Sequence, residues 1–402
     1  MINIAILGFG VVGGGVADLI TANAKEVTEL GGDTINIKYI LDLRDFPDSP
    51  FASKVIHDYN VIVNDPEIHT VIEVMGGSHP AYEFTVSALR AGKNVITSNK
   101  EVVANFGDEF MKIAEEEGVS YRFEAAVGGG IPALSPIISC VRQNKISEVR
   151  GILNGTTNYI LTKMFTFGDS FENALADAQD RGYAERNPDA DILGIDACRK
   201  IAILGALVTD KLVPTDMIHT EGITGVRHED VIAAEKIGMK IKLLGRCIST
   251  ADGVYIMVAP FMLGEDSALS GVSGVYNAIE VVGEPIKSVM FYGPGAGAGP
   301  TASAVVGDLM EIMRSARHCA IPTMIKDGSS VLSFDSYKCR SYIAIKGGCM
   351  GCVADAFGKV QAIDASGEIA FVTEKMCESD VNAAIKKLES KGAALLSRIR
   401  LL

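Results

Sequence analysis

The chain has 402 residues, with 37 Lys and Arg against 50 Asp and Glu, so its formal net charge is −13 with the histidines neutral. This acidic balance argues against nucleic acids and anionic membranes as partners, because both repel a negatively charged protein. The length predicts two or three domains, and a hydrophobic content of 48% is enough to bury several cores, which argues against disorder.

Three features of the sequence predict a cytoplasmic protein with free thiols. Residues 1–7 lead directly into a glycine motif, without the basic region and cleavage site of a signal peptide. The longest uncharged run, 288–307, carries glycines and prolines that a lipid-exposed helix would not tolerate. The eight cysteines are too few for a disulfide scaffold, so we expect thiols that fill apolar space. Cys349 and Cys352 form a C-x-x-C pair, without a second pair at zinc-finger spacing.

The first part of the chain alternates short β-branched runs with helical stretches. Strands are predicted at 2–7, 35–41, 71–75, 94–97 and 119–123, and helices at 11–23, 80–91 and 101–117. This alternation, with near-continuous apolar strands, is typical of a parallel sheet covered on both faces. The predicted fold class is therefore α/β, with a doubly wound, Rossmann-like domain. The glycine-rich segment 128–132 ends the pattern, so this domain is expected to span residues 1–132.

The strongest local signal is a glycine motif that follows the first strand and opens the first helix. Its residues are Gly8, Phe9, Gly10, Val11, Val12 and Gly13. In a G-x-G-x-x-G motif the first glycine permits a tight turn, the second lets the backbone approach a pyrophosphate, and the third lets helix and strand pack closely. The motif predicts dinucleotide binding at the helix N-terminus; the alternative is a tight turn without a ligand. We also expect Gly76 and Gly297 to contact the cofactor.

The end of the second strand bears on the choice between NAD and NADP. Asp42 could accept a hydrogen bond from the ribose 2′-hydroxyl of NAD, whereas the guanidinium of Arg44 favours the 2′-phosphate of NADP. Strand alternation puts both side chains on the same side, so both could reach the cofactor. We favour NADP, because a forked donor at a strand end has few structural reasons to exist. The alternative is a solvated loop arginine.

After residue 132 the pattern changes to long amphipathic helices and longer strands. Helices are predicted at 171–181, 192–209 and 230–237, and strands at 146–153, 241–248 and 254–258. We expect an α+β domain over 133–299 and then a helix at about 300–316. A linker at 317–337 leads to a small domain at 338–402. Its predicted elements are strand 341–346, helix 350–357, strands 359–363 and 368–373, helix 379–390 and strand 395–401.

Two lysines are candidates for chemistry. Lys100 follows the predicted strand 94–97, at the carboxyl edge of the sheet where doubly wound folds bind ligands; the alternative is an ordinary helix-start lysine. Lys200 lies four residues after Asp196, and hence on the same face of an otherwise apolar helix. The two could form a structural ion pair, but a partly buried lysine is also a candidate acid or base.

The chain resembles homoserine dehydrogenases. The resemblance rests on motifs that occur in the family's order: G-F-G-V-V-G at 8–13, T-S-N-K-E at 97–101, E-A-A-V-G-G-G-I-P at 124–132, N-G-T-T-N-Y at 154–159, G-Y-A-E-x-x-P-x-x-D at 182–191, G-x-D-x-x-R-K at 194–200 and G-A-G-x-G-P-T-A-S-A-V at 295–305. Such enzymes interconvert L-homoserine and L-aspartate 4-semialdehyde with NAD or NADP, in the branch that leads to threonine and methionine. The resemblance implies such an oxidoreductase, as a homodimer or homotetramer. It also implies that the domain over 133–299 binds substrate and mediates oligomerisation, and that the helix at about 300–316 belongs to the first domain.

The resemblance also implies roles for individual residues. Glu185 would bind the substrate's α-ammonium group, and the rest of that pocket would comprise Asp191, Tyr183 and Thr156. Lys200 would exchange the proton of the reacting hydroxyl, Asp196 would orient Lys200, and Lys100 would stabilise the charge that develops on the oxygen. A structural monovalent cation such as sodium would be held by Glu124 and the backbone carbonyls of Val127, Gly129 and Ile131.

The small C-terminal domain resembles the ACT-type regulatory domain of many family members, whose order is βαββαβ. The resemblance is partial, because the loop that usually carries an acidic-Arg-Pro-Gly pattern reads K-G-G-C-M-G-C at 346–352. The second strand, at about 359–363, is also very short. The sequence is compatible with feedback by threonine and with a reduced domain kept for packing.

Two other functions fit parts of the sequence. Another amino-acid or sugar dehydrogenase of similar build would need a different reason for the cluster at 185–200. A non-catalytic nucleotide or amino-acid sensor would have no need of both lysines. Homoserine as the substrate is what the resemblance to homoserine dehydrogenases implies.

Overall fold

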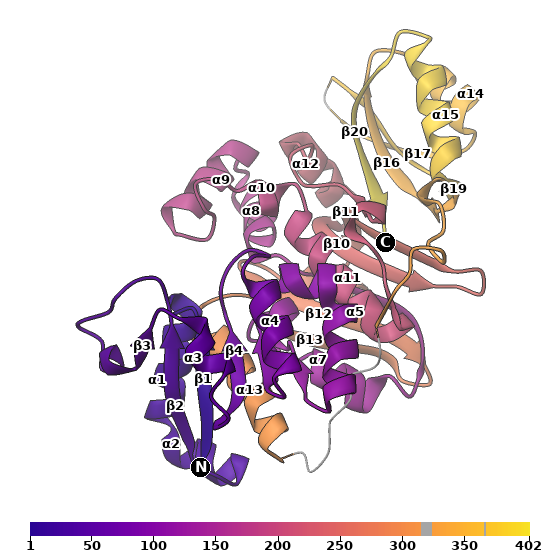
Figure 1. The fold of residues 1–402 in the computed structure, drawn as a ribbon. Coiled ribbons are helices and arrows are strands. Elements are labelled where there is room, and N and C mark those ends of the chain that lie inside the picture. Colours follow the sequence, from indigo (N-terminus) through magenta and orange to yellow (C-terminus); the bar gives the residue numbers. More distant parts are fainter. Residues whose placement is uncertain (315–323, 366) are drawn as a thin grey trace. The chain divides into compact units, whose positions relative to one another are not determined.

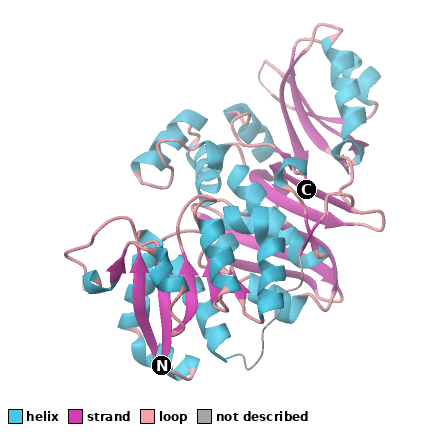
Figure 2. Ribbon diagram, viewed as in Figure 1, coloured by secondary structure: helices cyan, strands magenta, loops and turns pink. Residues whose placement is uncertain are grey.

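The computed structural model describes residues 1–314, 324–365 and 367–402, which Figures 1 and 2 show. The chain forms two compact units. Unit 1 comprises residues 1–145, 202–215 and 291–328, and unit 2 comprises residues 146–201, 216–290 and 329–402. Residues 315–316 of the expected helix and 317–323 of the expected linker lie outside the described residues.

Unit 1 is built on a six-stranded sheet with the order β3-β2-β1-β4-β5-β6. The strands are β1 (Ile2–Leu7), β2 (Ile35–Leu41), β3 (Val55–Ile56), β4 (Ile68–Glu73), β5 (Asn94–Thr97) and β6 (Tyr121–Arg122). All neighbouring strands are parallel, which confirms the predicted Rossmann-like fold. The strand order reverses between β1 and β4, and ligands of such sheets bind at the carboxyl ends of the strands beside this reversal.

Three strands of this sheet differ from the prediction. One of them, β6, covers only Tyr121–Arg122 where 119–123 was predicted. The short β3 was not predicted. β4 ends at Glu73, whereas the predicted strand ran to Met75. The reason is that the amide of Met75 donates to the carboxylate of Glu73, at 2.8 Å, and so bends the chain out of the strand.

The helices of unit 1 cover the sheet, and one of them comes from a distant part of the sequence. They are α1 (Val11–Ala22), α2 (Ala24–Gly31), α3 (Tyr59–Val63), α4 (Ala81–Arg90), α5 (Lys100–Glu117), the short α6 (Ala125–Gly128) and α7 (Leu134–Pro136), and α13 (Ala298–Arg314). Ile6 of β1, Ile20 of α1 and Leu309 of α13 share one buried core, and Figure 1 shows α13 beside the first strands. A Cβ atom at Gly15 would lie 3.3 Å from the Cβ of Ala302, so glycine lets α1 and α13 approach closely.

Unit 1 extends past the expected boundary at residue 132 because Glu124 holds the following segment. The Glu124 carboxylate accepts hydrogen bonds from the amides of Ala133, Leu134 and Ser135, at 2.7, 2.8 and 2.7 Å. A short parallel pair, β8 (Lys211–Leu212) with β14 (Ile325–Lys326), also belongs to this unit.

Unit 2 is built on a mixed sheet of ten strands. Nine follow the order β13-β12-β7-β10-β11-β20-β16-β18-β17, and the tenth, β9, pairs with β11. The strands are β7 (Lys145–Ile152), β9 (His219–Thr220), β10 (Met239–Ser249), β11 (Val254–Gly264), β12 (Tyr276–Glu284), β13 (Lys287–Pro294), β16 (Ser341–Lys346), β17 (Val360–Ile363), β18 (Ile369–Thr373) and β20 (Ala394–Leu401). The helices are α8 (Gly155–Phe167), α9 (Phe171–Asp180), α10 (Asp189–Ile192), α12 (His228–Lys236), α14 (Met350–Phe357) and α15 (Glu378–Glu389), together with the first part of α11 (Ile195–Thr209), whose residues from 202 onward belong to unit 1. The sheet runs through the expected boundary between the second and third domains.

The C-terminal segment of unit 2 has the predicted β-α-β-β-α-β order, and its elements begin and end within one residue of the prediction. Its strands pair antiparallel in the order β17-β18-β16-β20, and a small separate pair joins β15 (Lys338–Cys339) to β19 (Met376–Cys377). Val353 of α14 and Val381 of α15 pack on Phe371 of β18, so both helices cover one face of these strands (Figure 1). The segment does not stand apart, because β20 also pairs in parallel with β11.

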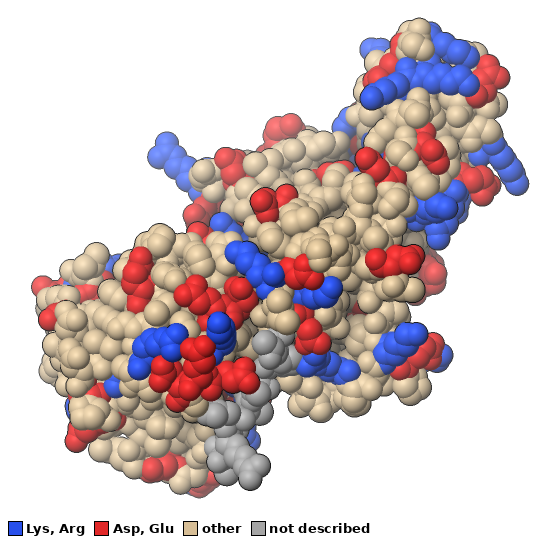
Figure 3. All heavy atoms as spheres, turned by 45° about the vertical axis from the view of Figure 1, so that its right-hand side comes forward, with Lys and Arg blue, Asp and Glu red and all other residues tan. Residues whose placement is uncertain are grey.

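Two properties of the surface are relevant to partners. Among the described residues, no helix has both the length and the apolar content that crossing a membrane requires. On the face drawn in Figure 3, acidic and basic side chains are interspersed and much of the surface carries no charge.

Candidate active site

The glycine motif forms the turn between β1 and α1. Gly8 has a φ of +93°, a conformation that favours glycine. A Cβ atom at Gly13 would lie 2.0 Å from the carbonyl oxygen of Gly8, so a side chain does not fit there. Gly10 precedes α1 without a side-chain cap, which leaves the first amides of the helix available to a phosphate. The turn therefore has the close helix–strand packing that the motif predicts.

The side chains between these glycines differ in burial. The ring of Phe9 is buried and meets the rings of Phe46 and Phe51 edge to face, with centroids 5.0 and 6.0 Å away. Val12 packs on the same core, whereas Val11 is 75% exposed. The side chain of Phe9 therefore serves the core.

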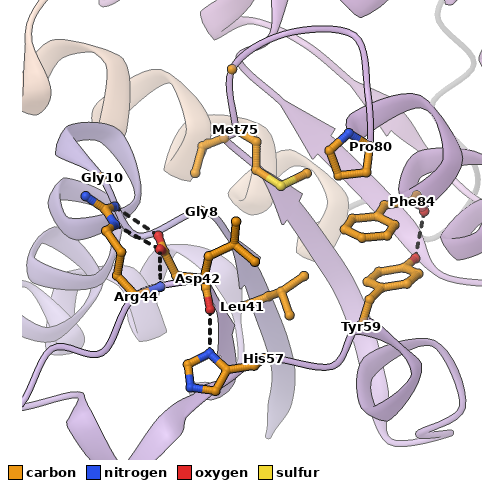
Figure 4. A pocket seen from close by; sticks show the side chains of 13 residues that line it. Gly8, Gly10, Leu41, Asp42, Arg44, His57, Tyr59, Met75, Pro80 and Phe84 are labelled. Carbon is orange, nitrogen blue, oxygen red and sulfur yellow. Dashed lines mark hydrogen bonds and ion pairs between the residues drawn. The ribbon is translucent and has the colours of Figure 1, made fainter.

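A cavity of about 510 Å³ opens at the carboxyl ends of the strands beside this turn. Four of the predicted cofactor residues line it: Gly8, Gly10, Arg44 and Gly76. Figure 4 shows the polar groups Asp42, Arg44 and His57 on one side, and Pro80, Phe84 and Tyr59 on the other. The rings of Tyr59 and Phe84 stack with their centroids 4.0 Å apart. Lys100 and Gly297 are not among the described residues that line this cavity.

Asp42 and Arg44 contact one another at the mouth of this cavity. The guanidinium of Arg44 donates to the Asp42 carboxylate through Nε and Nη2, at 3.0 and 3.1 Å. The backbone amide of Phe9 donates to the same carboxylate at 2.8 Å. Hydrogen bonds from Arg44, together with the one from Phe9, lower the pKa of Asp42 to about 2. The sequence presented the two side chains as alternatives, but in the structure they form one pair.

His57 adds a second basic group that the sequence analysis missed. Its Nδ1 lies 2.7 Å from the carbonyl oxygen of Asp42, and its Nε2 lies 3.1 Å from the carboxylate of Asp45. The hydrogen bond to the Asp42 carbonyl raises the pKa of His57. The cavity mouth therefore carries both Arg44 and His57.

In unit 2, Lys200 and Asp196 lie one helical turn apart on α11 and are both buried. The Nζ atom of Lys200 lies 2.9 Å from Oδ2 of Asp196, and it donates a hydrogen bond of 2.7 Å to the carbonyl oxygen of Leu153. The helix begins after Gly194, whose φ is +82°. The predicted pairing of this lysine and this carboxylate is present.

Asn154 joins this pair to Asp191, and the sequence analysis did not assign it a role. Its amide nitrogen donates to Oδ1 of Asp191 at 2.7 Å and to Oδ2 of Asp196 at 2.9 Å. Its amide oxygen caps α8 by accepting from the amide of Thr157 at 2.8 Å. Burial raises the pKa of Asp191, and the neighbouring charge of Asp196 adds to this effect. Asn154 thus fixes two carboxylates beside the lysine.

Thr156 and Tyr183 also contact one another. The Thr156 hydroxyl donates its hydrogen to the carbonyl oxygen of Tyr183 at 2.6 Å. The Tyr183 ring meets the ring of Tyr159 edge to face, with centroids 5.0 Å apart. The Glu185 side chain is exposed, and no partner for its carboxylate occurs among the described residues. The structure therefore does not bring Glu185 into contact with the other residues of the cluster.

Lys100 is the first residue of α5 in unit 1. The preceding Asn99 caps this helix with its side-chain oxygen, and its amide nitrogen donates to the carbonyl oxygen of Gly77 at 2.7 Å. Asn99 thus ties the start of the Lys100 helix to the loop that carries Gly76. Nearby, Thr97 donates to Glu73 at 2.6 Å, and burial raises the pKa of Glu73 to about 7.

The residues expected to hold a cation lie at α6 and the loop after it. Both carboxylate oxygens of Glu124 accept backbone amides, as described above, and the Glu124 amide donates to Asp308 at 2.8 Å. Gly129 has a φ of +58°, and a Cβ atom there would lie 2.3 Å from the carbonyl oxygen of Gly295. No group of three His, Cys, Asp or Glu side chains that could hold a metal occurs in the described parts of the chain.

Comparisons with known proteins decide the family. The model of the homoserine dehydrogenase family matches residues 132–310, and that of the NAD-binding domain of homoserine dehydrogenase matches residues 8–124. Homoserine dehydrogenase from Synechocystis sp. is 35% identical to this chain over 96% of each sequence. That of Bacillus subtilis is 38% identical over 79% of this chain and 74% of its own length. The crystal structure of a homoserine dehydrogenase from Thiobacillus denitrificans matches with a TM-score of 0.91 and 33% identity, over 100% of this chain and 98% of that one.

The chain belongs to the homoserine dehydrogenase family. It is therefore an oxidoreductase that acts on the CH–OH group of homoserine with a nicotinamide dinucleotide, in amino-acid biosynthesis. A further similar structure, a hyperthermophilic archaeal homoserine dehydrogenase mutant, was solved in complex with NADPH; its TM-score is 0.66 at 28% identity, over 77% of this chain and 97% of that one.

The sequence signals for the missed residues of this homoserine dehydrogenase were weak. Asn154 opens the motif N-G-T-T-N-Y and Asn99 lies in T-S-N-K-E, so both could have been found by asking which motif residues cap helices. His57 lies outside every motif, and nothing in the sequence pointed to it.

Proposed function

We propose that Lys200 is the acid and base of homoserine oxidation in this chain. A nicotinamide cofactor held at the turn of Gly8 and Gly10 would supply the acceptor for the hydride from C4 of homoserine. Lys200 accepts the proton of the 4-hydroxyl group. In the reverse direction Lys200 returns this proton to the aldehyde oxygen. The observation that carries the proposal is the buried contact of 2.9 Å between Lys200 and Asp196, whose carboxylate stabilises the ammonium group as it forms.

Asn154 supports this role by holding the carboxylates in place. Because its amide donates to Asp191 and Asp196 at once, neither carboxylate can turn away from Lys200 without losing a buried hydrogen bond. We propose Asp196 as the positioning partner of Lys200, and Asp191, Thr156 and Tyr183 as parts of the substrate pocket. Lys100 of α5 would stabilise the charge on the reacting oxygen.

Glu185 is proposed to bind the α-ammonium group of homoserine, since its carboxylate is exposed and available to a cation. The variant Glu185→Gln is expected to raise KM for homoserine by about 10–100-fold, because it loses a charge-assisted hydrogen bond to the substrate. KM for the cofactor should change little. Steady-state kinetics with each substrate varied in turn checks this. The matched control is Glu172→Gln, since Glu172 is an exposed acidic residue on α9. An equal rise in both constants for Glu185→Gln would contradict the role.

NADP is the proposed cofactor, because Arg44 stands at the mouth of the cavity with a forked donor, and His57 adds a second basic group. The charge of Asp42 is already matched by Arg44 and the amide of Phe9, so it repels a 2′-phosphate less than a free carboxylate would. NAD remains usable, since Asp42 lies beside the same cavity.

The variant Arg44→Ala is expected to weaken NADP binding by about 10–100-fold, and NAD binding little, because only NADP offers a phosphate to the guanidinium. Fluorescence titration of wild type and variant with both reduced cofactors measures this. Arg90→Ala is the control, since Arg90 is exposed and pairs with Glu116 on the surface. An unchanged NADP affinity in Arg44→Ala would transfer the role to Asp42.

A structural monovalent cation such as sodium is proposed at Glu124 and the carbonyl groups of Val127, Gly129 and Ile131. Backbone oxygens suit a hard cation, and in the described residues these three carbonyls accept no hydrogen bond from a backbone amide of a turn or loop. Glu124 would join them with the lone pair that its three amide donors leave unused.

The assembly is proposed to be a homodimer or homotetramer in the cytoplasm. Supporting this, the edge strand β13 of the mixed sheet exposes Met290 and Tyr292 to 38% and 53%, and exposed apolar groups on an edge strand favour pairing with another chain. For the segment 338–402 we propose an ACT-like domain, on the basis of its β-α-β-β-α-β order.

A further inference from the structure

The C-x-x-C pair lies at the surface, where β16 passes into α14. Cys349 is exposed and Cys352 is half-buried, so neither is the apolar filler that the sequence analysis expected of the cysteines. Their sulfur atoms are 3.0 Å apart, about 1 Å more than the length of an S–S bond. Two accessible thiols at this separation can join with little movement of the chain.

Cys349 also occupies a position that favours its thiolate. It is the residue before the eight-residue helix α14, and its sulfur accepts a hydrogen bond from the amide of Cys352 at 3.3 Å. The hydrogen bond from the Cys352 thiol, with those from backbone amides, lowers the pKa of Cys349, while the Cys349 sulfur raises the pKa of Cys352. The two thiols are therefore unequal. Cys349 is the better nucleophile, and Cys352 is the resolving thiol, which reacts second.

The loop before the pair is held in place. Gly347 and Gly348 have φ values of +79° and +81°, which favour glycine. A Cβ atom at Gly347 would lie 3.2 Å from the carbonyl oxygen of Gly392, and one at Gly348 would lie 3.5 Å from the Cβ of Ala393. This turn packs against the chain between α15 and β20. The packing therefore fixes the position of Cys349.

The other described cysteines lack a second sulfur atom at this separation, and one of them, Cys377, is half-buried. Cys198, Cys247 and Cys339 are buried, and burial raises the pKa of Cys247 to about 12 and that of Cys339 to about 11. Cys140 is exposed, but its sulfur atom lies 3.3 Å from the hydroxyl of Ser139, not beside a second thiol. Among the described cysteines, no other pair has sulfur atoms in hydrogen-bond contact.

We propose that Cys349 and Cys352 form a thiol–disulfide exchange site whose co-substrate is a disulfide of a small thiol or of a protein. The thiolate of Cys349 attacks one sulfur of the external disulfide, forms a mixed disulfide and expels the first thiolate. Cys352 then loses its proton and attacks the sulfur of Cys349, which closes the Cys349–Cys352 bond and releases the second thiol. Two protein thiols are thus oxidised by two electrons, and one external disulfide is reduced to two thiols.

The experiment equilibrates the reduced full-length chain, without oxygen, in buffers with graded ratios of reduced to oxidised glutathione. Free thiols are then trapped by acid and alkylation, and peptides are identified by mass spectrometry. The expected product is an intramolecular Cys349–Cys352 disulfide. Its ratio to the dithiol form should rise in proportion to the glutathione disulfide concentration divided by the square of the reduced glutathione concentration, as a two-thiol exchange requires. Cys140 serves as the internal control and is expected to form only a mixed disulfide with glutathione.

Two variants separate the steps. Cys352→Ser removes the resolving thiol, so Cys349 is expected to accumulate as a mixed disulfide with glutathione. Cys349→Ser is expected to leave Cys352 reacting more slowly than Cys349 does in the first variant. The site is disproved if the pair stays reduced at ratios that modify Cys140, or if each thiol only takes up glutathione separately. A disulfide between two chains would disprove it as well.

Discussion

Lys200→Ala is expected to lower the turnover number for homoserine oxidation by about 10²–10⁴-fold, the usual effect of removing a general acid or base. The hydroxyl proton would then have no acceptor next to Asp196. The glycine turn and the cavity proposed for the cofactor lie in unit 1, and the substitution removes none of their side chains. The dissociation constant of the cofactor should therefore stay nearly unchanged. Absorbance of the reduced nicotinamide gives the turnover number, and fluorescence titration gives the dissociation constant.

Controls distinguish chemistry from misfolding. Lys200→Arg keeps the positive charge but holds its proton at any working pH, so its turnover should fall nearly as far. Lys163→Ala removes another lysine of unit 2, which pairs with Asp169 at 3.5 Å, and should leave turnover unchanged. Near-normal turnover in Lys200→Ala, with circular dichroism like that of wild type, would exclude Lys200 from the mechanism.

Arg400→Met is expected to lower the free energy of unfolding by about 3–5 kcal/mol, the usual cost of breaking a buried ion pair. Arg400 is 2% exposed, and its guanidinium donates to Glu221 at 2.7 and 2.9 Å and to Glu378 at 2.9 Å from each of two nitrogens. Methionine fills similar space but leaves these carboxylates without that partner. Urea unfolding followed by circular dichroism measures the change, since the chain has no tryptophan for fluorescence.

The loss in Arg400→Met should depend on pH. Burial by itself raises the pKa of Glu221, but the hydrogen bonds from His219 and Arg400 outweigh it and lower the pKa to about 2. A carboxyl group with a lowered pKa stabilises the fold above its unfolded pKa of about 4.3, and this contribution is lost as the pH falls toward 2. The difference between wild type and variant should therefore be largest above about pH 5 and shrink below it. A loss that is equal at all pH values would contradict the role of the charge.

The surface provides the matched control for Arg400. Lys287 pairs with Glu284 at 2.8 Å, but their side chains are 76% and 68% exposed. Lys287→Ala should change the free energy of unfolding by less than about 1 kcal/mol, because water screens an exposed pair. A loss of several kcal/mol in both variants would point to a general effect of removing basic residues.

Local sequence was enough to predict much of this fold. The apolar strand, the glycine motif and the helix after it lie next to one another in the chain, so β1, the turn and α1 could be placed from spacing alone. The same holds for Asp196 and Lys200, because residues four apart on a helix share a face whatever surrounds them. The β-α-β-β-α-β order of the C-terminal segment likewise follows from periodicities of two and 3.6 residues.

Only the tertiary structure decided which distant residues meet. Asn154 reaches Asp191 and Asp196 across 37 and 42 positions, and Arg400 reaches Glu221 across 179. No periodicity relates such positions, because their distance is set by how strands and helices pack, and not by the spacing between residues. For the same reason the pairing of β20 with β11, which joins the C-terminal segment to the sheet of unit 2, could not be predicted. Sequence determined the elements and the local chemistry, and packing determined which buried carboxylates, amides and cations face one another.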